Sequence, residues 1–99
     1  MVYKIEWRAN ALKEFEKLDN SVRIRISKFI DKLKKRDDPK TLGEQLEENL
    51  SGYWKYRVGN YRLIADIQDD KLIIHIITIG HRSVIYKLLS KKLKNSDQN

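Results

Sequence analysis

Two strand-forming runs joined by Gly59-Asn60 constrain the fold of this chain more than any other stretch. Tyr, Trp and Val in these runs favour strands, and a Gly-Asn pair tolerates the positive φ angles of a tight turn. The sequence therefore predicts a β-hairpin in which Arg57 lies opposite Arg62. Because side chains alternate across a strand, Lys55 shares a face with these two arginines. Like charges that face one another destabilise a sheet, so this face of three cations indicates a binding site for an anion.

The distribution of charge fits an anionic partner. The 99 residues carry a formal net charge of +7, and the Lys and Arg residues are concentrated in residues 20–40 and 81–99. Clustered cations are typical of proteins that bind polyanions. Charge alone leaves a second interpretation equally open, in which the basic surface is simply solvated and binds nothing.

Length and patterning predict a single domain over residues 1–93, followed by a polar tail over residues 94–99. No apolar run reaches the length of about 20 residues that a membrane-spanning helix needs. The N-terminal residues alternate as in a strand and lack the apolar region of a signal peptide, so we expect a cytoplasmic protein. The absence of cysteine excludes disulfides and thiolate metal sites.

The order of the periodic segments predicts an α+β fold. Strand-like alternation at residues 2–7 precedes two stretches of helical spacing, at residues 11–18 and 22–33, which we expect to form an αα-hairpin. Three further strands and a short C-terminal helix complete the chain. We expect a small antiparallel sheet with the αα-hairpin packed on one face, so that the cationic face stays partly open.

A second tight turn is expected at Asp69-Asp70. Residues 72–79 are nearly continuous in apolar β-branched side chains, which is typical of a central strand. A two-residue turn at this position pairs Arg62 with Ile77, and therefore predicts an isoleucine beside the cations.

The second predicted helix has a basic surface beside its apolar stripe. The cations on this surface are Arg23, Arg25, Lys28, Lys32 and Lys35. A solvated helix face is one interpretation. The other is that Lys28 and Lys32 help to bind an anionic substrate.

Composition and spacing exclude most standard catalytic sites. The chain has no Gly-rich phosphate loop, and His75 and His81 are isolated rather than placed at metal-ligand spacing. We expect His75 to be structural. The acids Glu44, Glu47 and Glu48 fall in a predicted loop, where we expect them to be solvated and without a partner.

The hairpin and residues 80–86 remain as candidates for chemistry. The end of the last strand is expected to bring His81, Arg82 and Tyr86 to the edge of the cationic face. Such a set suits the cleavage of an RNA strand, because Arg and Lys hold the phosphate and stabilise the extra charge of the transition state. An aromatic ring can stack on an unpaired base. The 2′-hydroxyl of RNA can supply the nucleophile, so neither a metal nor a protein nucleophile is required.

Three motifs resemble a known family. They read Ala-Leu-Lys-Glu-Phe-Glu-Lys-Leu at residues 11–18, Leu-Ser-Gly-Tyr-Trp-Lys-Tyr-Arg-Val-Gly-Asn-Tyr-Arg-Leu-Ile at 50–64, and Ile-Gly-His-Arg-Ser-Val-Ile-Tyr at 79–86. In this order they resemble the RelE toxins of the RelE/ParE superfamily of type II toxin–antitoxin systems. The resemblance implies a fold like that of microbial ribonucleases, and ribosome-dependent endonucleolytic cleavage of mRNA in the A site, which inhibits translation. It also implies that no metal or other cofactor takes part, and that the partners are the ribosome, mRNA and a RelB-like antitoxin.

The resemblance further implies roles for individual residues. The catalytic positions of the family match Lys55, Arg57, Arg62, Arg82 and Tyr86. Lys55 matches a lysine proposed as the base, and the chemistry agrees, since an arginine stays protonated and cannot accept a proton. Arg82, His81 and Tyr86 remain alternatives for assisting the leaving group. Some relatives carry a further lysine where this chain has Tyr53, so one cation near Lys55 is missing.

Two other functions remain open. A ParE-like toxin would inhibit DNA gyrase by binding it and would have no nuclease activity. It would not require this particular set of hairpin cations. A generic RNA-binding module would bind RNA without turnover.

Overall fold

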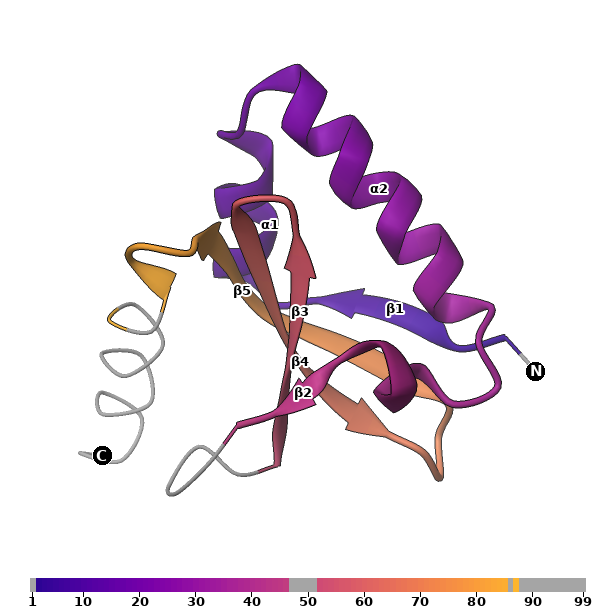
Figure 1. The fold of residues 1–99 in the computed structure, drawn as a ribbon. Coiled ribbons are helices and arrows are strands. Elements are labelled where there is room, and N and C mark those ends of the chain that lie inside the picture. Colours follow the sequence, from indigo (N-terminus) through magenta and orange to yellow (C-terminus); the bar gives the residue numbers. More distant parts are fainter. Residues whose placement is uncertain (1, 47–51, 86, 88–99) are drawn as a thin grey trace.

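The computed structural model describes residues 2–46, 52–85 and 87 and confirms the α+β class. In chain order, the elements are β1 (Lys4–Trp7), α1 (Ala9–Glu16), α2 (Asn20–Lys34), the 3₁₀-helix η1 (Pro39–Leu42), β2 (Glu44–Gln45), β3 (Tyr53–Val58), β4 (Tyr61–Gln68) and β5 (Ile73–His81) (Figure 1). The expected C-terminal helix and polar tail fall mainly on residues 86 and 88–99, outside the described residues. No described helix is long and apolar enough to cross a membrane.

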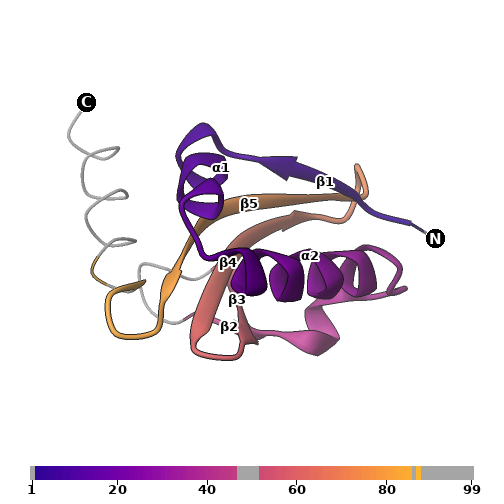
Figure 2. The ribbon, with the colours of Figure 1, turned by 90° about the horizontal axis from the view of Figure 1, so that it is seen from above.

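The sheet is mixed rather than antiparallel, which corrects the expected architecture. Its five strands lie in the order β1-β5-β4-β3-β2. β1 runs parallel to β5, whereas every other neighbouring pair is antiparallel. The two helices that follow β1 carry the chain across one face of the sheet to β2 at the opposite edge. β3, β4 and β5 then lead back, so that β5 pairs with β1 in the same direction (Figure 2).

One face of the sheet carries the main core and the two helices. The apolar stripe of α2 is buried at Ile26, Ile30 and Leu33 and packs with Tyr56 and Leu63 of the sheet. α1 packs beside β5, and α2 lies across β3 and η1 (Figures 1 and 2). The helices therefore cover the face opposite to the hairpin cations, as the sequence predicts.

The register between β4 and β5 differs from the expected one by two residues near the β4–β5 turn and by three residues near the hairpin. Arg62 pairs with Gly80 rather than with Ile77. The connection spans residues 69–72 instead of two residues, and Leu72 adopts a left-handed conformation with φ 55°. A leucine seldom adopts this conformation, so local sequence gave no sign of the longer turn.

A β-bulge adjusts this register in the middle of β5, where Ile77 is an extra residue opposite β4. The carboxylate of Glu14 in α1 accepts hydrogen bonds from the two residues that follow Ile77. Its Oε1 accepts a hydrogen bond from Thr78 Oγ1 at 2.8 Å and another from the Ile79 N–H at 3.1 Å. Asn10 Nδ2 donates to the Ile77 carbonyl at 2.9 Å. The polar groups of the bulge are thus satisfied by the first helix.

Removing the Glu14 carboxylate should destabilise the fold. Glu14→Ala leaves the buried Thr78 hydroxyl and the Ile79 N–H without this partner, and we expect a loss of about 1–3 kcal/mol in the free energy of unfolding. Urea denaturation followed by circular dichroism measures it. The matched control is Glu16→Ala at the exposed end of the same helix, and equal stability of the two variants would contradict the assigned role.

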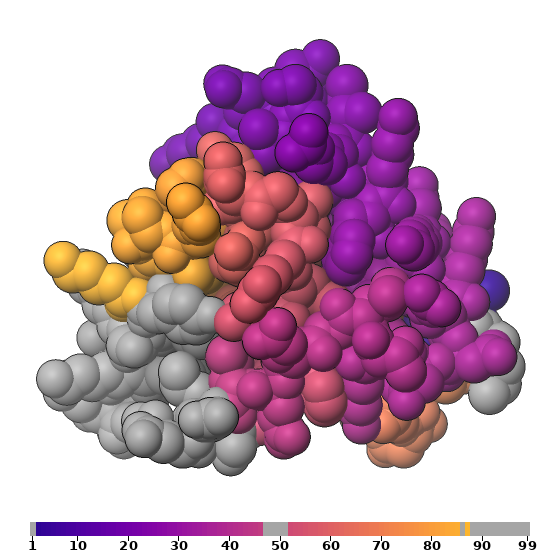
Figure 3. Space-filling model, in the orientation of Figure 1, coloured from indigo at the N-terminus to yellow at the C-terminus, as the bar shows by residue number. Residues whose placement is uncertain are grey.

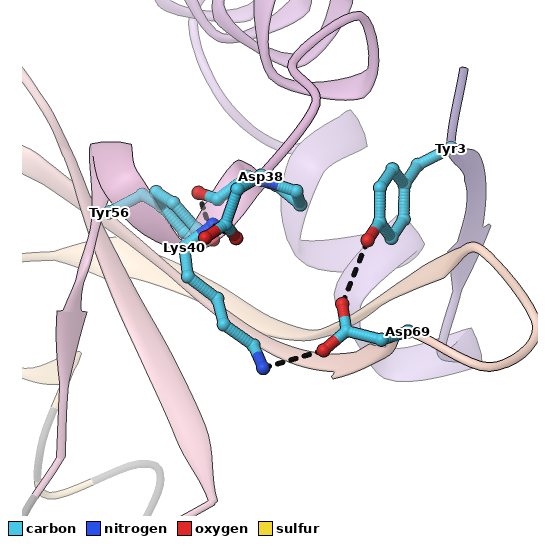
Figure 4. Close-up of polar contacts among 6 residues, drawn as sticks. Tyr3, Asp38, Lys40, Tyr56 and Asp69 are labelled. Atoms are coloured by element: carbon cyan, nitrogen blue, oxygen red, sulfur yellow. Dashed lines mark hydrogen bonds and ion pairs between the residues drawn. The ribbon is translucent and has the colours of Figure 1, made fainter. Parts of the chain in front are cut away.

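A polar cluster joins the residue before β1, η1 and the β4–β5 turn (Figure 4). It lies at the opposite end of β4 from the hairpin turn (Figure 1). Asp69 accepts a hydrogen bond from Tyr3 Oη at 2.8 Å and one from Lys40 Nζ at 2.6 Å. The bond to Asp69 raises the pKa of Tyr3 to about 12, and the bonds from Lys40 and Tyr3 lower the pKa of Asp69. Nearby, Tyr56 Oη donates to the Pro39 carbonyl at 2.9 Å. These contacts hold η1 against β3 and the β4–β5 turn.

The Asp69 contacts should make stability depend on pH in the acid range. Because the pKa of Asp69 is lower in the folded chain than its ordinary 3.8, the carboxylate stabilises the fold above about pH 4 and loses this effect as the pH falls through the folded pKa. We therefore expect Asp69→Ala to lose about 1 kcal/mol at pH 7 and much less at pH 3, since these groups are partly exposed. Thermal unfolding at both pH values, with Asp70→Ala as control, tests this. An equal loss at both pH values would argue against it.

Candidate anion-binding site on the hairpin

The β3–β4 hairpin forms as the sequence predicts. Arg57 pairs with Arg62, and Val58 pairs with Tyr61 across the turn. Gly59 has a positive φ of 61°, the conformation for which glycine is suited. Since directly paired residues share a face, the two arginines lie side by side on the face opposite to α2.

The centre of the cationic face is covered, so the face is less open than expected. Leu46, Ile64, Ile77 and Ile85 are buried together there, and Tyr53 packs against them. Ile77 reaches this second cluster through the bulge in β5. The cluster confines the cations to the part of the face near the hairpin and the β2 edge.

Glu44 has partners, which corrects the expectation that it is solvated and unpaired. It belongs to β2 and lies directly opposite Lys55 of β3. Glu44 Oε2 lies 3.5 Å from Lys55 Nζ, and Oε1 lies 3.4 Å from Arg57 Nη2. A strand of two residues has no readable periodicity, so the sequence offered no signal for this pairing. The other two acids of that expectation, Glu47 and Glu48, lie outside the described residues.

The three hairpin cations differ in exposure and in how they are held. The side chain of Lys55 is 14% exposed, whereas that of Arg57 is 63% exposed. Arg62 Nη1 donates to the Gly59 carbonyl at 3.0 Å and to the Tyr61 carbonyl at 2.9 Å. The Arg62 guanidinium is thus oriented by the turn itself, and Arg57 is the most exposed of the three.

Arg82 arrives at the same end of the hairpin from β5. Its backbone N–H donates to the carbonyl of Asn60 at 2.8 Å, and its side chain is exposed. Residues 81–85 and 87 (orange in Figure 3) therefore flank the hairpin on one side, and the segment that leads to β2 flanks it on the other. Tyr86 lies outside the described residues. Its neighbour Ile85 is buried against Ile64 and Ile77 on the cationic face.

His81 is not brought together with the cations, contrary to expectation. It pairs with Tyr61 and shares that residue's face, which is opposite to that of Arg62. The His81 ring meets the Tyr61 ring edge-on at 5.5 Å. The N–H of Ser83 donates to His81 Nδ1 at 3.1 Å, and the Ser83 hydroxyl oxygen lies 2.8 Å from the same nitrogen. The three-residue shift in register puts this ring on the helix-covered side.

Lys28 and Lys32 are also separate from the hairpin cations. Both are exposed on α2, which packs on the opposite face of the sheet. Another cation of this helix does reach the hairpin: a Cβ at Gly59 would lie 2.6 Å from Arg25 Nη1. The basic surface of α2 therefore meets the hairpin only at the turn.

The arrangement can hold an anion with several charged groups. Lys55, Arg57 and Arg62 present adjacent cationic side chains on one face, and Arg82 lies at its end. Because these cations come from two strands and from the end of a third, they can contact several phosphates of one chain. Within the described residues, Glu44 is the carboxylate that pairs with these cations.

Comparisons with known proteins give the same family from sequence and from structure. The family model for the ParE toxin of the type II toxin–antitoxin system parDE matches residues 5–86. A RelE-like toxin protein of Escherichia coli is 34% identical over 98 residues, which cover 95% of this chain and 100% of the relative. The mRNA interferase toxin RelE of Escherichia coli K12 is 28% identical over 96 residues, which cover 94% of this chain and 99% of that protein.

The fold has counterparts among solved structures. The toxin–antitoxin complex RelBE2 of Mycobacterium tuberculosis contains a chain that matches with a TM-score of 0.75 at 24% identity. The match covers 82% of this chain and 99% of that chain. With the family model and the E. coli relatives, the chain belongs to the RelE/ParE toxin superfamily and is a RelE-like toxin of a type II toxin–antitoxin system.

Proposed function

We propose that this toxin is a ribosome-dependent endoribonuclease that cuts mRNA in the ribosomal A site and thereby inhibits translation. The observation that supports this most is the gathering of Lys55, Arg57 and Arg62 on one face, with Arg82 at its end. The E. coli relative named mRNA interferase toxin RelE, which aligns over 94% of this chain, supports the same class of reaction.

The proposed reaction is an attack by RNA on its own backbone. The 2′-oxygen bonds to the adjacent phosphorus and the bond from phosphorus to the 5′-oxygen breaks. The products are a 2′,3′-cyclic phosphate and a 5′-oxyanion, which takes a proton from water to become a 5′-hydroxyl. Lys55 in its neutral form is the base that accepts the proton of the 2′-hydroxyl, because the neighbouring arginines stay protonated and cannot accept one. Arg57 and Arg62 stabilise the negative charge that builds up on the phosphate oxygens.

The departing 5′-oxygen needs a positive group at the other end of the site. The backbone bond from Arg82 to Asn60 at the hairpin turn supports this role for Arg82, whereas the His81 ring lies on the opposite face of the sheet. We therefore favour Arg82 over His81 for stabilising the leaving group. Tyr86 remains a candidate for stacking on a base or for assisting the same oxygen.

A RelB-like antitoxin is the expected protein partner. The solved relative from Mycobacterium tuberculosis is a toxin–antitoxin complex, and its toxin chain has the fold of this chain. The antitoxin would hold the toxin inactive until it is removed.

The second candidate function is inhibition of DNA gyrase without nuclease activity. It is favoured by the matching family model, which describes a ParE toxin. The dense hairpin cations are less readily explained by it. A gyrase supercoiling assay beside primer extension on translated mRNA separates the two functions, because each predicts a signal in one assay alone.

Loss of single site cations should abolish mRNA cleavage. We expect Arg62→Ala and Arg82→Ala each to lower the cleavage rate on translating ribosomes by about 10²- to 10³-fold, since each removes a stabiliser of transition-state charge. Primer extension on mRNA from a translation reaction maps the cut ends. Lys71→Ala removes an exposed cation from the β4–β5 turn and serves as the matched control. Unchanged cleavage in both arginine variants would refute the site.

A further inference from the structure

A carboxylate of the chain itself lies on the cationic face. Glu44 is opposite Lys55 across β2 and β3, and directly opposed residues share a face. Its two oxygens are divided between two cations, with Oε2 3.5 Å from Lys55 Nζ and Oε1 3.4 Å from Arg57 Nη2. A bound phosphate would divide its oxygens between neighbouring cations in the same way.

We propose that Glu44 is an exchangeable counter-ion, which occupies the anion site in the free protein and is replaced there by a phosphate of the RNA strand. That the ligand is RNA rests on the proposed function. The displacement of the Glu44 carboxylate by another anion is inferred from its contacts, and it does not depend on which reaction the site carries out.

The contacts of Glu44 are suited to exchange. Both distances exceed the roughly 2.7–2.9 Å of a charge-assisted hydrogen bond. The side chains of Glu44 and Arg57 are 59% and 63% exposed, so water and salt compete for both groups. Lys55, by contrast, is 14% exposed and is held in the sheet. The cation therefore stays in place when the carboxylate leaves.

The backbone on both sides of Glu44 makes close contacts in the folded sheet, and exchange of the carboxylate requires a movement of the Glu44 side chain alone. A Cβ at Gly43 would lie 2.7 Å from Cε1 of Tyr56 and 3.0 Å from the Lys55 carbonyl, which shows how closely the chain packs before Glu44. After it, the Leu46 N–H donates to the Tyr53 carbonyl at 3.0 Å. A change of Glu44 side-chain conformation would release its contacts with Lys55 and Arg57 without disturbing β3.

Exchange favours a strand over a single phosphate. One phosphodiester carries about the same charge as the carboxylate that it replaces, and Glu44 has the advantage of being attached to the site. A strand adds further phosphates that bind Arg62 and Arg82 at the same time, and such linked contacts outweigh a single one. Glu44 would thus lower the affinity for short anions more than for a long strand.

The test measures binding without cleavage. A fluorescent single-stranded oligonucleotide of 2′-O-methyl RNA cannot be cut by 2′-attack, and fluorescence anisotropy across a salt series gives its affinity for the free toxin. We expect Glu44→Gln to bind about three- to tenfold more tightly than the wild type, with a steeper dependence on salt by about 0.7 in the logarithmic slope. Asp31→Asn is the matched control. It makes the same change of charge at an exposed ion pair with Lys34 on α2.

A double variant locates the effect. In an Arg57→Gln background, the gain from Glu44→Gln should shrink, because one of the two cations that Glu44 neutralises is gone. Thermal unfolding verifies that all variants are folded. Equal or weaker binding by Glu44→Gln, an equal gain in Asp31→Asn, or no binding by any variant at low salt overturns the proposal. Failure of ribosomal cleavage by the wild type instead overturns the proposed nuclease and leaves the binding result to stand by itself.

Discussion

The register of β4 against β5 determines where almost everything else in this molecule lies. It depends on one extra residue, Ile77, whose neighbours are bonded by the carboxylate of Glu14. The bulge turns Ile77 toward the cationic face, where it completes the second apolar cluster. The same register brings the end of β5 level with the β3–β4 turn. A single side chain of the first helix therefore contributes both to the core and to the position of Arg82.

Electrostatic repulsion among the hairpin cations is the second constraint, and neighbouring groups of the chain offset it. Arg57 and Arg62 face one another across the hairpin, an unfavourable pairing for a sheet. The turn carbonyls accept hydrogen bonds from Arg62, and Glu44 offsets the charge of Lys55 and Arg57. The cations are therefore compatible with a folded hairpin before any ligand binds. Removing this internal compensation would expose the site fully, at some expense in stability.

Local sequence predicted the features that depend on neighbouring residues. The Gly59 turn, the pairing of Arg57 with Arg62 and the buried stripe of α2 follow from turn chemistry and periodicity, and all three are present. The same reasoning placed the three hairpin cations together. The fold class also followed, since the order of strands and helices can be read along the chain.

The errors all involve contacts between distant segments or unusual backbone. Parallel pairing of β1 with β5 has no local signature, and the two residues of β2 are too few to show a pattern. The positive φ of Leu72 accompanies the longer second turn, which shifts the register by two residues, and the bulge at Ile77 adds the third residue that moves His81 to the opposite face. The contacts of Glu44 with the hairpin cations were not predicted, because Glu44 lies in β2, which is too short to show a pattern. The part of the site that depends on the sheet edge was therefore not readable from sequence.

β4 is buried on both faces, so it should open less easily than β2 at the edge of the sheet. Leu63, Ile64 and Ala65 are consecutive and almost completely buried, because one cluster lies on each side of the strand. Local opening has to disrupt both clusters to reach β4, whereas β2 is held at the edge by two residues. Amide hydrogens of β4 should accordingly exchange with solvent among the slowest in the chain, and those of β2 among the fastest. The carboxylate-bearing edge can fluctuate while the strand that carries Arg62 remains rigid.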